Sequence, residues 1–143
     1  MLGIYQDHGI RFEYPFEWEL EVSDDGPRTT VTVQAPDGLM FTLVTIDDSR
    51  PAPADLADEA LAVMREEYPD LDAAPAIESI AGHRAIGHDL EFFSLDVINS
   101  STIRCFRSPS RTVLVFDQWS DLAGEDPEGT VRAVRNSLEE LEA

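Results

Sequence analysis

Residues 103–116, with the sequence IRCFRSPSRTVLVF, decide the fold of this chain. Two apolar runs, Ile103–Phe106 and Val113–Phe116, flank a turn-forming Ser-Pro-Ser segment at 108–110, which is the pattern of a β-hairpin. The second run is apolar at every position, so both of its faces need cover and we expect it at the centre of a sheet. The segment therefore predicts an antiparallel sheet with packed layers on both sides.

Further strands are predicted on either side of this hairpin along the chain. Some segments alternate apolar and polar residues, which is the period of a half-buried strand. Others are apolar at both odd and even positions, which is typical of a strand covered on both faces. The alternating segments are 10–14, 18–22 and 30–34, and the doubly apolar ones are 39–46 and 85–98. We also expect a short strand at 77–80 and a turn at 99–101, where the sequence is Asn-Ser-Ser.

Two helices are predicted, one in the middle of the chain and one near its end. The first begins near Asp55 and stops at Pro69, and the second begins at Asp126 and Pro127, which are N-cap and N1 residue types. Their apolar stripes are Ala57, Leu61, Met64 and Tyr68 in the first helix and Val131, Val134, Leu138 and Leu141 in the second. The expected order is four strands, a helix, four strands and a helix.

This order predicts one α+β domain over residues 1–143. We expect an antiparallel sheet of about six to eight strands with two main helices and cover on both faces. The helices lie either on opposite faces of the sheet or together on one face, with long loops covering the other.

The chain is strongly acidic, with 29 Asp and Glu residues against 10 basic ones, a net charge of −19 at pH 7, and Arg as its only basic residue. A nucleic-acid-binding surface must neutralise phosphates, so this balance argues against such a role, and it also disfavours anionic membranes. The acidic residues are spread along the chain, which favours a general solvating surface. The absence of Lys beside this acidic excess has three alternative explanations. They are adaptation to high salt, a GC-rich genome that favours Arg codons, and an acidic surface for a basic partner or divalent cations.

Nothing in the sequence predicts export, a lipid anchor or a membrane span. Residues 1–9 hold no Lys or Arg and no apolar run of signal-peptide length. No segment approaches the roughly 20 apolar residues of a membrane helix, and the single cysteine allows no internal disulfide. We therefore expect a cytoplasmic protein that is not inserted in a membrane.

The segment Gly9–Trp18, GIRFEYPFEW, resembles the opening pattern of the PsbP-like superfamily, Gly-hydrophobic-x-Phe-x-Tyr-Pro-x-x-Trp. That superfamily includes the PsbP extrinsic protein of photosystem II, a Ran-binding nuclear-import factor and the bacterial DcrB-like domains, some of which resemble chaperones of secreted effectors. The resemblance implies an α/β/α sandwich with a largely non-catalytic binding role. It carries over Phe12, Tyr14, Pro15 and Trp18 as residues of the fold, and no functional residue.

The stretch 97–116 holds three arginines and no acidic residue, in a chain that is one-fifth acidic. Arginine side chains recognise carboxylate or phosphate with two parallel hydrogen bonds, so this stretch predicts a surface for an acidic partner or ligand. The alternative is that the arginines pair with acidic residues on neighbouring strands. The predicted partner-binding residues are Arg104, Arg107, Arg111, Trp119 and Phe92, with Leu90 beside them in an apolar groove.

The leading prediction for function is thus a non-catalytic protein-binding, adaptor or chaperone-like module, with an unidentified protein partner and no cofactor. The alternative is a small hydrolase or metal-dependent enzyme that uses His83, His88, Asp89 and Cys105. The two histidines are an odd number of residues apart, so a regular strand would point them to opposite faces. A cysteine in an apolar strand is more often a small core residue, and the acidic runs lack the spacing of a calcium-binding loop.

Overall fold

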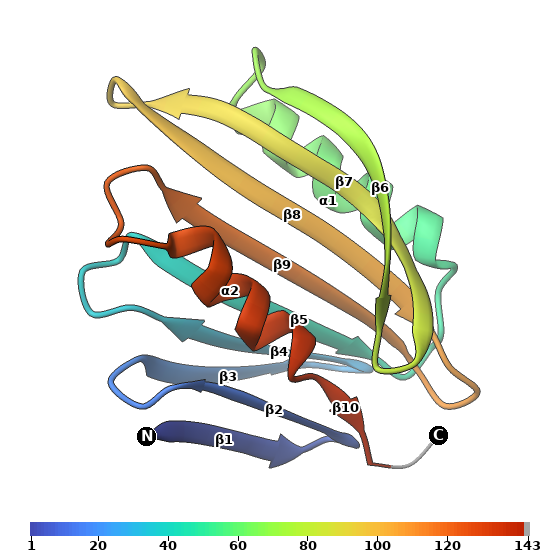
Figure 1. The fold of residues 1–143 in the computed structure, drawn as a ribbon. Helices are drawn as coiled ribbons and strands as arrows, with labels where there is room; N and C mark the ends of the chain where they lie inside the picture. The colour runs from blue at the N-terminus through green and yellow to red at the C-terminus, as the bar shows by residue number, and fades with distance from the viewer. Residues whose placement is uncertain (142–143) are drawn as a thin grey trace.

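The structure, a computed structural model, describes residues 1–141. This part of the chain forms ten strands and two helices, α1 (Pro53–Glu67) and α2 (Pro127–Asn136) (Figure 1). The strands are β1 (Leu2–Asp7), β2 (Ile10–Pro15), β3 (Glu19–Asp25), β4 (Arg28–Gln34), β5 (Met40–Asp47), β6 (Asp72–Ile80), β7 (His83–Ser94), β8 (Val97–Arg107), β9 (Thr112–Ser120) and β10 (Glu139–Glu140). Every strand pairing is antiparallel.

The larger sheet has seven strands in the order β3-β4-β5-β9-β8-β7-β6, and β9 is its middle strand. The prediction of a central strand at 113–116 is confirmed, because Val113, Leu114 and Val115 are each at most 5 % exposed. The smaller sheet has the order β1-β2-β10. The two edges of the larger sheet are β3, which is rich in acidic residues, and β6, which contains Pro75.

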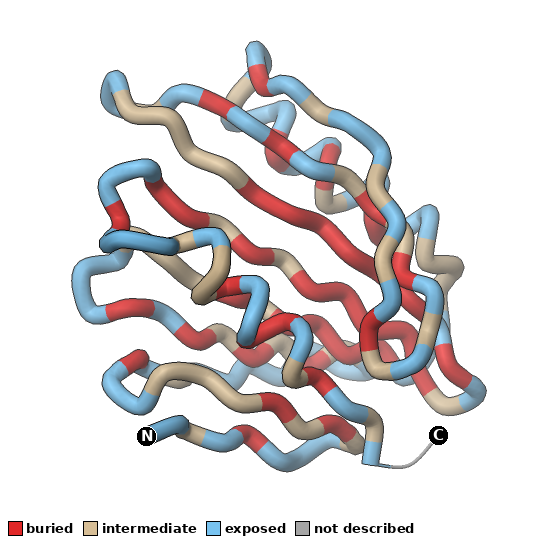
Figure 2. Tube along the Cα trace, viewed as in Figure 1, coloured by how far each residue is buried: buried red, intermediate tan, exposed pale blue. Residues whose placement is uncertain are grey.

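The two helices lie on opposite faces of the larger sheet (Figure 1), which confirms the first of the two predicted arrangements. Alternate residues of β9 divide between two cores: Val113 and Val115 pack with Val131 of α2, and Leu114 packs with Leu61 of α1. The smaller sheet joins the core on the α2 side through Ile10 and Phe12 of β2, and Figure 2 shows long buried stretches in the middle of the larger sheet. The architecture is an α+β sandwich, as predicted.

The opening segment contributes to this core as its resemblance implied, since Phe12 is 1 % and Trp18 is 6 % exposed. The start of α2 also follows the prediction. Pro127 occupies its first turn, and the Asp126 carboxylate accepts a hydrogen bond from the backbone N–H of Gly129 at 3.0 Å. Neither helix found in residues 1–141 has the length and apolar character needed to cross a bilayer.

The predicted turn at 99–101 is wrong. The chain turns instead at Leu95 and Asp96, whose φ angles are 55° and 63°, and 99–101 lie inside β8. These three polar residues pair with Ser120, Trp119 and Gln118 of β9, so the backbone hydrogen bonds of the sheet outweigh their local preference for a turn.

Two strands at the ends of the chain were not predicted. Residues 2–7 form β1 by pairing with β2, which raises the strands before α1 to five. The apolar stripe to Leu141 predicted a longer final helix, but α2 ends at Asn136 and residues 139–140 pair with Arg11 and Ile10 as β10. Leu138 lies just after the helix and is still buried, because it packs in the core shared with the smaller sheet.

Candidate functional site

The predicted arginine Arg104 lies in the middle of β8 and is only 6 % exposed. Its Nε donates to Oε1 of Glu78 at 2.5 Å, and its Nη2 donates to Oδ1 of Asp89 at 2.7 Å. Its Nη1 donates to the carbonyls of His88 and Ile103. Arg104 therefore pairs with acidic residues of neighbouring strands, which was the structural alternative considered for the arginine-rich stretch.

The other two arginines lie at the far end of β8 and the start of β9. Arg111 is 9 % exposed, and its Nη1 donates to Oε2 of Glu140 at 2.6 Å. Arg107 is exposed, and its Nη1 donates to the carbonyl of Arg50 at 3.3 Å. Of the three predicted arginines, only Arg107 presents its side chain to solvent.

The predicted apolar residues are divided between the two faces of the sheet. Phe92 and Leu90 belong to the α1 core, and Phe92 stacks on Tyr68 with ring centroids 4.1 Å apart. Trp119 belongs to the α2 core and is 9 % exposed. The structure therefore does not bring Phe92, Trp119 and all three arginines together on one surface. Of these predicted residues, only Arg104, Trp119 and Leu90 line a common cleft.

The residues of the predicted enzyme alternative are also separated. His83 stacks on Phe106 on the α2 face, and His88 hydrogen-bonds Asp58 of α1 at 3.2 Å on the other face, as their odd spacing predicted. Cys105 is fully buried in the α1 core, and burial raises its pKa to about 12, so the thiol stays protonated at neutral pH. Within residues 1–141, no group of three or more His, Cys, Asp or Glu side chains is placed to hold a metal ion.

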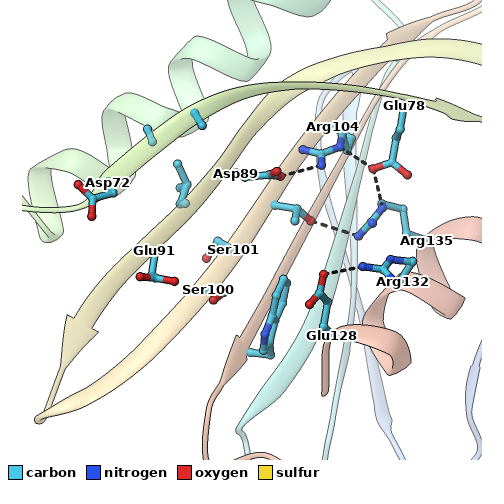
Figure 3. A pocket seen from close by; sticks show the side chains of 15 residues that line it. Asp72, Glu78, Asp89, Glu91, Ser100, Ser101, Arg104, Glu128, Arg132 and Arg135 are labelled. Carbon is cyan, nitrogen blue, oxygen red and sulfur yellow. Dashed lines mark hydrogen bonds and ion pairs between the residues drawn. The ribbon is translucent and has the colours of Figure 1, made fainter. Parts of the chain in front are cut away.

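A polar cleft of about 640 Å³ lies between α2 and strands β6–β8 (Figure 3). A series of alternating charges runs along the cleft in the order Asp117, Arg135, Glu78, Arg104, Asp89, of which all but Asp117 line it. The Nε of Arg135 lies 3.1 Å from Oε1 of Glu78, which also accepts from Arg104. Each buried charge of this network thus has an opposite charge from another element of the same chain.

Asp117 is the most buried member of the network, with no exposed surface. Burial raises its pKa, while Arg135 and the hydroxyls of Thr42 and Thr102, which donate at 2.5 and 3.1 Å, partly offset that shift. No lining residue of the cleft is His or Cys. The arrangement is that of an ion-pair network of alternating charges that links α2 to the sheet, rather than that of an acid–base or nucleophilic centre.

The opposite face holds an apolar groove of about 460 Å³ between α1 and strands β5 and β9, here called the α1 groove. Its floor includes Phe41, Leu43 and Phe116, and Phe41 stacks on Phe116 with centroids 5.8 Å apart. All three are half-buried. Its wall includes Val63 of α1, which is 58 % exposed, and the half-buried Tyr68 directly after the helix.

An ion-pair cluster forms part of the groove lining. Arg28 of β4 lies 3.2 Å from Oδ2 of Asp47 and 3.5 Å from Oε1 of Glu59 on α1. Burial alone would raise the pKa of Asp47, but hydrogen bonds from Ser49 and Arg28 hold it below its usual value. Arg28 is therefore engaged by this chain's own carboxylates.

The sequence contains a signal for this groove. The strand at 39–46 is apolar at both odd and even positions, which predicts cover on both of its faces. Helix α1, however, packs on β7, β8 and β9. Phe41 and Leu43 therefore face a hollow. Which strands a helix covers depends on the order of strands in the sheet, and that order is not local information.

No protein-family profile and no curated protein matches this chain. Solved structures do match it across almost its whole length. CyanoP, the cyanobacterial PsbP of Synechocystis, aligns with a TM-score of 0.61 and 15 % identity over 97 % of this chain and 92 % of that protein. The fold is PsbP-like. This finding confirms the expectation raised by Gly9–Trp18.

Two further structures share the PsbP-like fold. LpqN of Mycobacterium tuberculosis aligns with a TM-score of 0.51 and 11 % identity over 97 % of this chain and 90 % of its own. A protein from Bacteroides thetaiotaomicron aligns with a TM-score of 0.60 and 10 % identity over 94 % of this chain. This chain spans about half the length of that protein, 46 %. At these identities the likeness concerns the fold alone.

Proposed function

We propose that this chain is a non-catalytic protein-binding module that takes a segment of its partner in the α1 groove. The observation that carries the proposal is the groove itself, a hollow of about 460 Å³ lined by Phe41, Leu43, Phe116 and Val63. Small-molecule and peptide sites are typically concave, mostly apolar and of this size. Contiguous apolar surface of this kind on a soluble domain marks an interaction site more often than chance exposure.

The energetics favour a protein segment that makes both apolar and polar contacts. Burial of each large apolar side chain contributes roughly 1.5–3 kcal/mol. Association itself costs on the order of 4–15 kcal/mol in lost freedom. Filling the groove with apolar groups alone would therefore give weak binding, and a specific partner also needs the charged groups along the rim of the groove, such as Glu59 and Glu67.

The placement of the reactive residues supports a role without catalysis. The Cys105 thiol is buried and protonated, and the two histidines of the enzyme alternative lie on opposite faces. The fold is shared with CyanoP and with LpqN, and LpqN is described as involved in cell envelope biogenesis. This likeness supports a non-catalytic accessory role for this chain. An adaptor or chaperone-like role and a cytoplasmic location remain predictions, and cell fractionation tests the second.

Affinity capture tests the proposal directly. The tagged protein and a double variant, Phe41→Ser/Val63→Asn, are used to capture proteins from the lysate of the cells that make the protein, with mass spectrometry as the readout. We expect partners enriched by the native protein to be lost from the double variant. The matched control is Phe93→Ser/Ile77→Asn, which removes two exposed apolar side chains outside the groove, 73 % and 59 % exposed.

Retention of every partner by the groove variant, with its folding verified by circular dichroism, would reject the groove as the binding site. An Arg107→Glu variant in the same experiment tests what remains of the predicted arginine surface. Loss of capture with Arg107→Glu alone would move the site to the end of β8.

A further inference from the structure

The α1 face of the larger sheet is covered by a helix over only part of its width. Helix α1 packs on β7, β8 and β9, and within the described residues no helix covers β3, β4 and β5 on that face. The opposite face is covered both by α2 and by the smaller sheet. The α1 groove is lined by residues of α1, β9 and β5, so it lies at the boundary between the covered and the open part of the face.

The dimensions of this open part fit one more helix. Neighbouring strands lie about 4.8 Å apart, and packed helices lie about 8–10 Å apart. A helix packed beside α1 would therefore lie about two strands from it, over β9 and β5. These two strands supply the groove floor, Phe41, Leu43 and Phe116, and α1 supplies Val63 on the side that would face the added helix.

Carboxylates line both sides of this position. On one side, Glu59 and Glu67 of α1 are exposed at the groove. On the other side, Glu21 of β3 pairs across the sheet with Thr32, which pairs with Leu43, so the Glu21 side chain shares the α1 face. Glu19 lies two residues away on the same face, and both are exposed.

The nearest cation is not available to offset these charges, because Arg28 already pairs with Asp47 and Glu59. Strand β3 lies about 10 Å from β5, a distance that a lysine or arginine on a docked helix can span. The charge pattern therefore complements a helix that is apolar below and cationic along both flanks.

We propose that the α1 groove docks a cationic amphipathic helix of a partner protein, seated over β9 and β5 between the acidic residues of α1 and β3. The inference rests on the proposed function and adds the chemistry of the partner segment to it. The apolar face of the helix packs on Phe41 and Phe116, and its basic flanks pair with Glu67 on one side and Glu21 on the other.

Synthetic helices provide the test. Three peptides of the same length as α1, 15 residues, are titrated into the isotopically labelled protein and followed by NMR. The first is an amphipathic Leu/Lys helix, the second has Glu in place of every Lys, and the third is a scrambled Leu/Lys sequence. We expect the first to bind at least about tenfold more tightly than the others, with the largest shifts at Phe41, Leu43 and Phe116.

Two pairs of matched variants separate the apolar and charged contributions. Phe41→Ser/Val63→Asn should weaken the Leu/Lys helix about tenfold or more, and Phe93→Ser/Ile77→Asn should leave it unchanged. Glu21→Gln/Glu67→Gln should weaken it and flatten its salt dependence. Asp72→Asn/Glu91→Gln removes the same charge from exposed positions on the opposite face and should have little effect.

Equal binding of the Leu/Lys and Leu/Glu helices in the groove would overturn the cationic specificity but leave the proposed function intact. Binding that ignores the groove variants would show that the peptide follows only the net charge of −19 and would overturn the inference. Concentration-dependent shifts of Phe41 without peptide would assign the groove to a second copy of the chain. Absence of all peptide binding would overturn the inference that the partner segment is a helix. The lysate capture would still test the groove as a binding site.

Discussion

At the scale of single residues, the main finding is that two of the three expected binding arginines, Arg104 and Arg111, are buried and paired with carboxylates of this chain. Arg104 and Arg135 hold three acidic side chains, Glu78, Asp89 and Asp117, in one network beside the polar cleft. Burying a charge is costly unless it is paired, so each member depends on its neighbours. Removing one member leaves an uncompensated charge inside the protein.

Asp117→Asn should therefore destabilise the protein strongly, by roughly 3–5 kcal/mol. The change leaves the buried Arg135 without its closest counter-charge, while Thr42 and Thr102 still contact the new amide. Urea denaturation followed by circular dichroism measures the loss.

The matched control is Arg132→Gln, one turn before Arg135 on the same helix. Arg132 pairs with Glu128 at the surface, with both side chains more than half exposed. We expect this change to alter the free energy of unfolding by less than about 0.5 kcal/mol. A similar loss for Asp117→Asn and Arg132→Gln would contradict a special role for the buried network.

At the scale of elements, β10 is held in place by a second charged cluster. Glu140 of β10 accepts a hydrogen bond from Nε2 of His83, at the start of β7, and one from Arg111, just before β9, both at 2.6 Å. Its strand pairs with β2. Glu140 thus joins the smaller sheet to two strands of the larger one, which explains why residues 139–140 extend as a strand after α2.

This cluster predicts a specific acid sensitivity. Burial alone would raise the pKa of Glu140, but hydrogen bonds from Ser108, His83 and Arg111 lower it below its usual 4.5. A depressed carboxyl pKa stabilises the fold above pH 4.5, and this stabilisation is lost as the pH falls through the folded-state pKa.

Glu140→Gln should lower the stability at about pH 7 by roughly 1.5–3 kcal/mol, because charged hydrogen bonds at a buried site are lost. Its unfolding curve should approach that of the native protein as the pH falls below 4.5. Glu139→Gln is the control, since Glu139 is the exposed neighbour on the same strand. A constant difference between Glu140→Gln and the native protein at every pH would contradict the assignment.

At the scale of the whole molecule, charge dominates the surface. The network and the Glu140 cluster use only a few of the 29 acidic residues, and others lie at exposed positions such as the edge strand β3. Charged edge strands resist pairing with other sheets. The same charges repel one another across the molecule, which opposes the compact state at low salt.

We therefore expect the melting temperature to rise by roughly 5 °C between low and molar KCl at about pH 7, as screening weakens this repulsion. Near the sequence pI of about 4.2 the net charge vanishes, and the gain should be much smaller. Calorimetry at both pH values measures the two gains. No gain at neutral pH would count against the prediction of salt adaptation.

Local sequence determined most of the elements of this protein and the identity of its central strand. The apolar run Val113–Phe116 must be covered on both faces, and Asp126 with Pro127 starts a helix wherever the rest of the chain lies. The pattern at Gly9–Trp18 also pointed to the PsbP-like fold. Such features follow from short-range periodicity and from capping chemistry, which act within a few residues.

Only the tertiary structure decided the sites, because a site depends on which distant residues become neighbours. Strand order placed Phe41 beside Phe116, which is 75 positions away, at the margin of the area that α1 covers. The same order placed Arg104 between Glu78 and Asp89. The arginine that the sequence predicted as a binding residue therefore forms ion pairs within the chain. Long-range pairing also converted the residues after α2 into β10, since the hydrogen bonds offered by β2 outweigh a helical stripe.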